Sequence, residues 1–191
     1  MAAVLLPACR EDDDPVEPAV TASPRTTLLW KRDHAIEQDL TRALELAPEE
    51  LCLELGSRPC ISEVHRASLG GHDPFEQGLY EPLATPLVTS PLALDRVVQA
   101  ACAERVRRDA ADPQVFAALD LDGEAPARDS EAYVKTVETL YRRLLTRDPL
   151  PAEQDLLAEL RVDADGKTVS AATFAVQACF AIGTTTEFIF L

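Results

Sequence analysis

The chain has 191 residues, 47% of them hydrophobic and 27% charged, so it can bury one sizeable core or two small ones. Its formal net charge is −15 at pH 7, which repels both a nucleic-acid backbone and anionic lipid headgroups. Nucleic-acid binding is therefore disfavoured, and the sequence lacks the run of about 18 apolar residues that a transmembrane helix requires.

The chain begins MAAVLLPACREDDDPVEPAV, an apolar run followed by a cysteine and then by acids and prolines. The acids and prolines after Cys9 cannot bury enough apolar surface to fold, and this composition suits an extended tether. We therefore predict that residues 1–26 lie outside the folded body.

Leu6-Pro7-Ala8-Cys9 resembles the end of a bacterial lipoprotein signal, in which the cysteine receives the lipid. Pro7 departs from that motif, and no Lys or Arg precedes Cys9, whereas a complete signal starts with basic residues and an apolar stretch. A misplaced start codon would leave such a remnant. The resemblance implies an extracytoplasmic lipoprotein, of the periplasm or cell surface, that meets the membrane only through Cys9. The alternative is the frayed end of a cytosolic protein.

Helical periodicity dominates after residue 26. The first predicted helix has one apolar face, formed by Leu29, Ile36, Leu40, Ala43 and Leu44. Pro48 opens a second short helix that Gly56 ends, and Pro59 opens a third that stops at Gly70-Gly71.

Residues 72–91, HDPFEQGLYEPLATPLVTSP, hold four prolines and show no period. A loop of this length in a compact domain is either functional or packed down by its own side chains. Its apolar residues favour a loop that wraps the helices, and they are Phe75, Leu79, Tyr80, Leu83, Leu87 and Val88. Because periodicity assigns no part of it to the core, this loop is also the candidate interaction surface.

Ser90-Pro91 starts the next helix, and Asp112-Pro113 gives the same signal for a short helix through Leu119. The C-terminal part predicts helices over 131–146, 151–161 and 169–182, followed by an apolar end docked on the core. The predicted core residues of these helices include Leu94, Val97, Val98, Ala101, Cys102, Val106, Val137, Leu140, Tyr141, Leu144, Leu156, Leu157, Phe174, Ala175, Ala178, Cys179 and Ile182.

No run of residues with the period of a strand appears, so the prediction is an all-α fold, an irregular helical bundle with a long, ordered, proline-containing loop. We expect an N-terminal helical region over 27–121, which includes the loop 72–91, and a C-terminal helical region over 122–191 packed on the same core.

The C-terminal third, about residues 134–191, resembles the helical tail domains of planctomycete-type, cytochrome-associated and secreted proteins of unknown function. The residues that carry the resemblance are Tyr141, Arg147, Pro149, Glu153, Glu187 and Phe188. The rest of the chain is similar, more loosely, to uncharacterised bacterial lipoproteins. The resemblance implies an envelope protein as partner, of a redox or cytochrome-associated kind, and it brings no catalytic residue with it.

Four cysteines remain if Cys9 carries a lipid, and they allow two disulfides with three possible connectivities. Cys52 and Cys60 are close in sequence, so we pair them, and we pair Cys102 with Cys179. The alternative is four buried free thiols, since cysteine packs readily as a small hydrophobic residue.

Two segments offer ligands for metals or small molecules. Counted from Asp120, the oxygens of Asp122, Glu124 and Glu131 have the spacing of a calcium loop, but its sixth position is not glycine. A solvated acidic linker is the alternative. His65, His72 and Asp73 flank a glycine pair and form a second candidate ligand site.

The basic cluster Arg105, Arg107 and Arg108 lies near a helix C-terminus, where positive charge is favourable, and we interpret it as salt-bridge partners. The sequence contains no phosphate-binding loop and no protease or esterase motif that would indicate an enzyme, and we expect no cofactor. The sequence therefore predicts an extracytoplasmic, lipid-anchored binding or assembly protein without catalytic activity, with a metal- or ligand-binding helical module as the alternative.

Overall fold

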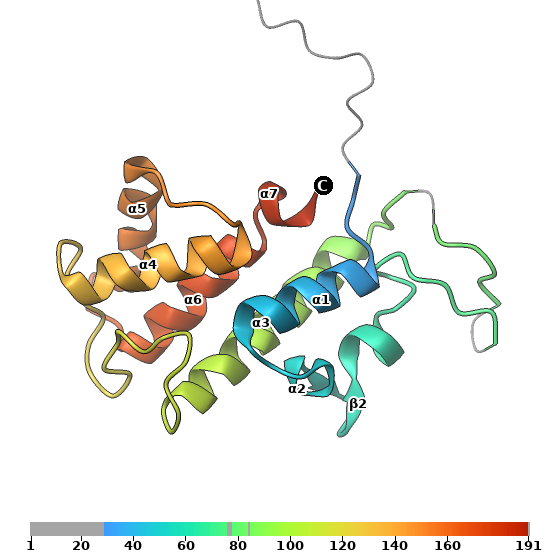
Figure 1. Ribbon diagram of the computed structural model, residues 1–191, viewed down its shortest axis with the longest axis horizontal. Coiled ribbons are helices and arrows are strands. Elements are labelled where there is room, and N and C mark those ends of the chain that lie inside the picture. Colours follow the sequence, from blue (N-terminus) through green and yellow to red (C-terminus); the bar gives the residue numbers. More distant parts are fainter. Residues whose placement is uncertain (1–28, 76–77, 84, 191) are drawn as a thin grey trace, which may run out of the picture.

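The computed structural model describes residues 29–75, 78–83 and 85–190. Helices predominate, which confirms the helical class (Figure 1). The prediction of no strands is wrong in one place, because β1 (Leu53–Glu54) and β2 (Arg58–Pro59) form a two-residue antiparallel pair. Strands this short carry no periodicity for a sequence to show.

The helices follow in this order: α1 (Asp33–Leu44), α2 (Pro48–Leu51), the π-helical turn η1 (Cys60–Val64), α3 (Ser90–Asp109), α4 (Glu131–Leu144), α5 (Pro151–Ala158), the 3₁₀ turn η2 (Glu159–Arg161), α6 (Ala171–Gly183) and α7 (Thr186–Ile189). Serine or threonine caps start three of them: Ser130 for α4, Ser170 for α6 and Thr185 for α7. Each of these side chains accepts a hydrogen bond from a backbone N–H of the first turn, which would otherwise lack a partner.

The centre of the fold is the contact between α3 and α6. Cys102 and Cys179 link the two helices, with their Cα atoms 5.9 Å apart. Gly183 lets them approach closely, because a Cβ at this position would lie 2.7 Å from Cγ1 of Val98. A disulfide that closes a loop this long stabilises the fold by about 4 kcal/mol when chain entropy alone is considered.

Buried hydrophobic residues from both predicted regions, 27–121 and 122–191, form one cluster. The predicted core positions of α3, α4 and α6 are buried, as is Phe188 in the apolar end of the chain. Two predicted core residues are exposed instead: Leu29 by 60% and Leu156 by 65%. Leu29 precedes the first turn of α1 and so does not share its apolar face.

Two predicted helices differ from the structure. Residues 112–119 form turns, because three backbone N–H groups of this segment donate to the carboxylate of Asp109 instead of to a helix. The predicted helix after Pro59 is only the turn η1, followed by further turns up to Gly71.

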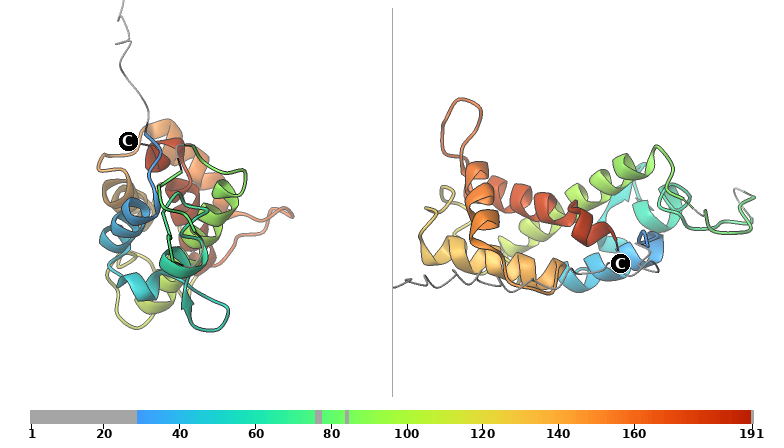
Figure 2. Two further views of the ribbon diagram at one scale, coloured as in Figure 1. Left: turned by 90° about the vertical axis from the view of Figure 1, so that its right-hand side faces the viewer. Right: turned by 90° about the horizontal axis from the view of Figure 1, so that it is seen from above.

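The two ends of the described chain lie side by side (Figures 1 and 2). The N–H of Lys31 donates to the carbonyl of Ile189 over 2.9 Å. The Lys31 ammonium, almost fully buried, pairs with Asp39 at 2.8 Å and lies 4.6 Å from the centre of the Phe188 ring. A cation over an aromatic ring gains further electrostatic stabilisation, so this lysine fastens the C-terminus to α1.

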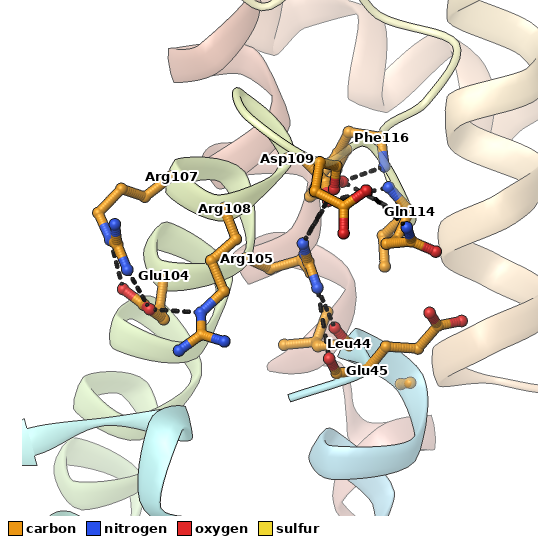
Figure 3. A network of polar contacts seen from close by, with 12 residues as sticks. Leu44, Glu45, Glu104, Arg105, Arg107, Arg108, Asp109, Gln114 and Phe116 are labelled. Carbon is orange, nitrogen blue, oxygen red and sulfur yellow. Dashed lines mark hydrogen bonds and ion pairs between the residues drawn. The ribbon is translucent and has the colours of Figure 1, made fainter. Parts of the chain in front are cut away.

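A buried ion pair between Arg105 and Asp109 joins three parts of the fold (Figure 3). The two charges are 2.6 Å apart, and both side chains are almost fully buried. The Asp109 carboxylate accepts hydrogen bonds from the N–H groups of Gln114, Val115 and Phe116. A buried charge is tolerated only when it is paired and hydrogen-bonded, and this carboxylate meets both conditions.

The same arginine also closes the end of α1. Arg105 donates to the carbonyls of Leu44 and Glu45, and Arg143 from α4 donates to the carbonyl of Ala43. The last carbonyls of a helix have no partner within the helix, so two arginines from neighbouring helices supply the missing donors. Arg105 is thus a salt-bridge partner, as interpreted, but it is buried in the fold and does not lie on the acidic surface.

Replacing Asp109 with alanine is expected to cost about 3–5 kcal/mol in the free energy of unfolding, because Arg105 would stay buried without its counter-charge. Urea denaturation followed by circular dichroism measures this loss. The matched control is Asp129→Ala, since the Asp129 side chain is 96% exposed, and its change should stay within about 0.5 kcal/mol. A loss of about 1 kcal/mol or less for Asp109→Ala would mean that the pair behaves like a surface ion pair.

Candidate functional site

The calcium candidate at 120–131 is an exposed turn followed by the start of α4. The side chains of Asp120, Asp122 and Glu124 face solvent. Glu131, which would close the loop, pairs with Lys135 on the next turn of α4 at 2.6 Å, and this hydrogen bond lowers the pKa of the Glu131 carboxyl. Sequence spacing is thus the only support for calcium here.

In the candidate ligand site of His65, His72 and Asp73, the His65 ring already contacts another side chain of the protein. Nε2 of His65 lies 2.8 Å from a carboxylate oxygen of Glu54, and the other oxygen of Glu54 lies 3.1 Å from Arg96. His72 is exposed, and Asp73 is buried. Within the described ranges, no group of three or more His, Cys, Asp and Glu side chains is arranged to hold a metal ion.

Cys52 and Cys60 lie at disulfide distance, with 5.6 Å between their Cα atoms, as predicted from their closeness in sequence. The pair brackets the β1–β2 turn and fixes it beside η1. A cysteine held in a disulfide is not a nucleophile, so Cys60 and His65 do not form a catalytic pair. Cys9 lies outside the described residues.

A hollow of about 470 Å³ between α2 and α3 is lined by apolar and charged residues, and four of the charged ones, Glu50, Glu104, Arg107 and Arg108, form ion pairs with one another. Arg107 donates two hydrogen bonds to Glu104, and Arg108 also pairs with Glu104 (Figure 3). Arg108 forms a second ion pair with Glu50 at 2.9 Å. The hydrogen bonds from Arg107 lower the pKa of Glu104 to about 2. These arginines are salt-bridge partners, as their sequence position predicts, and they present no unpaired charge to a ligand.

The polar residues of the C-terminal resemblance converge on Arg147. Its guanidinium forms ion pairs with Glu153 at the start of α5 and with Glu187 in α7, at 2.6 and 2.7 Å. It also lies over the ring of Tyr141, 5.1 Å from the ring centre. These hydrogen bonds lower the pKa of both carboxyls and raise that of Arg147. The motif therefore has a structural role, since it ties α4, α5 and α7 together.

In the segment 72–91, the described residues that precede α3 leave the helical body and extend to one side of the molecule, in green on the right of Figure 1. Phe75 is 97% exposed, Tyr80 77% and Val88 96%, so the prediction that these side chains pack onto the helices is wrong. Leu79 and Leu83 are half-buried. Arg32 donates to the carbonyl of Leu83 over 3.3 Å, which tethers the base of the segment.

An apolar groove of about 230 Å³ lies at the base of this segment, between the start of α3 and the two ends of the described chain. We call it the terminal groove; its apolar walls are Trp30, Pro86, Pro91, Leu94, Ile189 and Phe190. Trp30 lies close against Gly70, where a Cβ would come within 2.6 Å of the indole ring. Sequence reasoning missed this groove because its walls come from three distant parts of the chain.

Among the residues that the structure describes, one carboxylate, that of Asp95, lines the terminal groove. The Asp95 side chain is half-buried and makes no hydrogen bond or ion pair with any residue that the structure describes. Its neighbour Arg96 is engaged by Glu54. Within the described residues, the groove thus combines apolar walls with the unpaired negative charge of Asp95.

No family model, curated protein or solved structure matches this chain. Among the described residues, none of the helices combines the length and the apolarity that crossing a membrane requires. The features of this chain that bear on its function are the exposed apolar segment and the groove at its base.

Replacing Arg147 with leucine is expected to lower the free energy of unfolding at pH 7 by about 1–2 kcal/mol, the sum of two partly exposed ion pairs. The pKa values of Glu153 and Glu187 are lowered in the folded state, so their contribution is present above the unfolded pKa and is lost as the pH falls from about 5 to about 3. The wild-type and variant stabilities should therefore converge on acidification.

Urea midpoints measured between neutral and acidic pH check this convergence. Arg96→Leu is the control, because Arg96 is 65% exposed and pairs with the single carboxylate of Glu54, so this variant should differ from the wild type by less than Arg147→Leu does at neutral pH. Parallel profiles for the wild type and Arg147→Leu would contradict the account of Arg147.

Proposed function

We propose that this protein is an extracytoplasmic, lipid-anchored binding or assembly protein without catalytic activity, built as an irregular helical bundle. The observation that carries the proposal is the exposure of Phe75, Tyr80 and Val88 on one segment. Large apolar side chains gathered on an exposed segment are typical of a surface that binds another protein. A rigid body that presents such a segment suits a protein that recognises a partner.

The cysteines support placement outside the cytoplasm. The structure brings four of them together in two pairs at disulfide distance, Cys52 with Cys60 and Cys102 with Cys179. Disulfides form and persist in oxidising compartments and are rare in the cytosol. Together with the lipoprotein-like motif at Cys9, this favours a protein attached to a bacterial membrane by its lipid and facing the periplasm or the outside.

The partner in this proposal is another protein of the cell envelope. The C-terminal resemblance suggests a redox or cytochrome-associated protein. The chain's charge of −15 favours association with a basic surface, because electrostatic complementarity raises the association rate and disfavours acidic partners.

Photo-crosslinking in the native cell tests the proposal. A benzoylphenylalanine placed at Tyr80 or at Phe75 should form a crosslink to the same envelope protein. The matched control is the same residue at Leu156, which is 65% exposed on α5 and should not form that crosslink.

The captured protein is then purified and its affinity measured. The triple variant Phe75→Ser, Tyr80→Ser and Val88→Ser should bind it at least about tenfold more weakly, because apolar anchors dominate such interfaces. The free energy of unfolding should change by less than about 0.5 kcal/mol, since the three side chains are exposed. Equal crosslinking from position 156, or unchanged affinity of the triple variant, would contradict the proposal.

A further inference from the structure

We propose that the terminal groove receives an apolar side chain of a protein partner, and that Asp95 pairs with a lysine or arginine next to it. This inference deepens the proposed function and rests on it. It assigns to the partner a short recognition feature, an apolar residue followed closely by a basic one.

The size of the groove sets the size of its occupant. Its volume of about 230 Å³ lies below the range of about 300–1,000 Å³ that pockets for drug-sized ligands occupy. Trp30, Leu94 and Phe190 surround a space that suits one leucine or phenylalanine side chain. Aromatic and proline walls lose little conformational entropy when such an anchor enters.

The negative charge of Asp95 favours a partner with a positively charged side chain at this position. Asp95 is unpaired within the described part of the chain, and binding would remove it further from water, so the partner must supply a positive group. An anion is not favoured, because the Asp95 carboxylate would repel it and because two of the first-turn N–H groups of α3 already have partners. Ser90 donates to Leu87, Ala93 donates to Thr89, and Pro91 has no N–H.

The groove continues into the exposed apolar segment. Pro86 forms one wall, and the next two residues, Leu87 and Val88, are 42% and 96% exposed. Leu92, on the first turn of α3, is 66% exposed. A partner anchored in the groove would therefore also cover these side chains, which gives the interface a buried centre and an apolar margin.

Other occupants fit the charge less well. A second copy of this chain would bring another net charge of −15, and an anionic bilayer would face Asp95 with charge of the same sign. A basic protein segment meets no such repulsion.

The test uses the full chain, labelled with ¹⁵N, and three synthetic peptides: acetyl-Leu-Gly-Lys-amide and its glutamine and glutamate counterparts. Trp30 is the only tryptophan in the chain, so its indole N–H is an isolated NMR reporter within the groove. The lysine peptide should shift this signal saturably and bind about two- to fivefold more tightly than the glutamine peptide, with the glutamate peptide weakest.

The variant Asp95→Asn should remove the preference for lysine over glutamine and leave the urea midpoint unchanged. Asp122→Asn removes the same charge from an exposed position that does not line the groove, and it should keep the preference. If the preference fell equally in both variants, overall charge rather than Asp95 would explain it, and the inference would be overturned.

Three further outcomes would also overturn it. They are a lack of any saturable Trp30 shift, a Trp30 shift that appears on concentrating the protein alone, and a Trp30 shift caused by phosphatidylcholine vesicles. The second would identify a second copy as the occupant, and the third a lipid surface. The peptide experiment needs neither the lipid anchor nor an identified partner, so its failure concerns the groove alone and leaves the crosslinking result at Tyr80 to decide the proposed function.

Discussion

The buried contact between Arg105 and Asp109 fixes the framework on which the rest of the structure depends. One guanidinium neutralises a buried carboxylate and supplies donors to the C-terminal carbonyls of α1, while that carboxylate holds the N–H groups of residues 114–116. Helix α1, helix α3 and the turn that follows α3 are therefore positioned together. Removing any one member would leave a buried polar group without a partner, so the three parts should be lost together.

Helix α3 separates the stabilising end of the molecule from the end that we propose binds a partner. The ion pair lies in its last two turns, Cys102 links its middle to α6, and the terminal groove begins at its first turn. Twenty residues of helix span about 30 Å, so the exposed apolar segment is held at a distance from the network. With this arrangement, the exposed segment can carry apolar side chains for binding, and the stability of the core does not depend on them.

The sequence predicts those features that depend on local pattern. Period 3.6 identifies the buried faces of α3, α4 and α6, and closeness in sequence indicates the pair Cys52–Cys60, which leaves Cys102 and Cys179 as the second pair. Prediction from the sequence fails where tertiary contacts override the local pattern. Arginine is usually a surface residue. Arg105 is nevertheless buried, because carbonyls of α1 that lack a partner within the helix lie beside it. The apolar content of 72–91 suggests packing, but the composition of a loop does not say which surface covers it. The groove around Trp30 required the fold, since no local pattern joins residues 30, 94 and 190.

We propose above all that this protein works outside the cytoplasm, attached to the membrane through a lipid and cross-linked by two disulfides. A count of free thiols by mass spectrometry tests this claim most directly. The gene, with its upstream sequence, is expressed in a bacterium that exports lipoproteins, and the denatured, unreduced protein is alkylated and weighed. We predict that Cys52, Cys60, Cys102 and Cys179 take up no label and that Cys9 carries the mass of a lipid. Labelling of all five cysteines without a lipid would contradict the claim and would place the search for a partner in the cytosol.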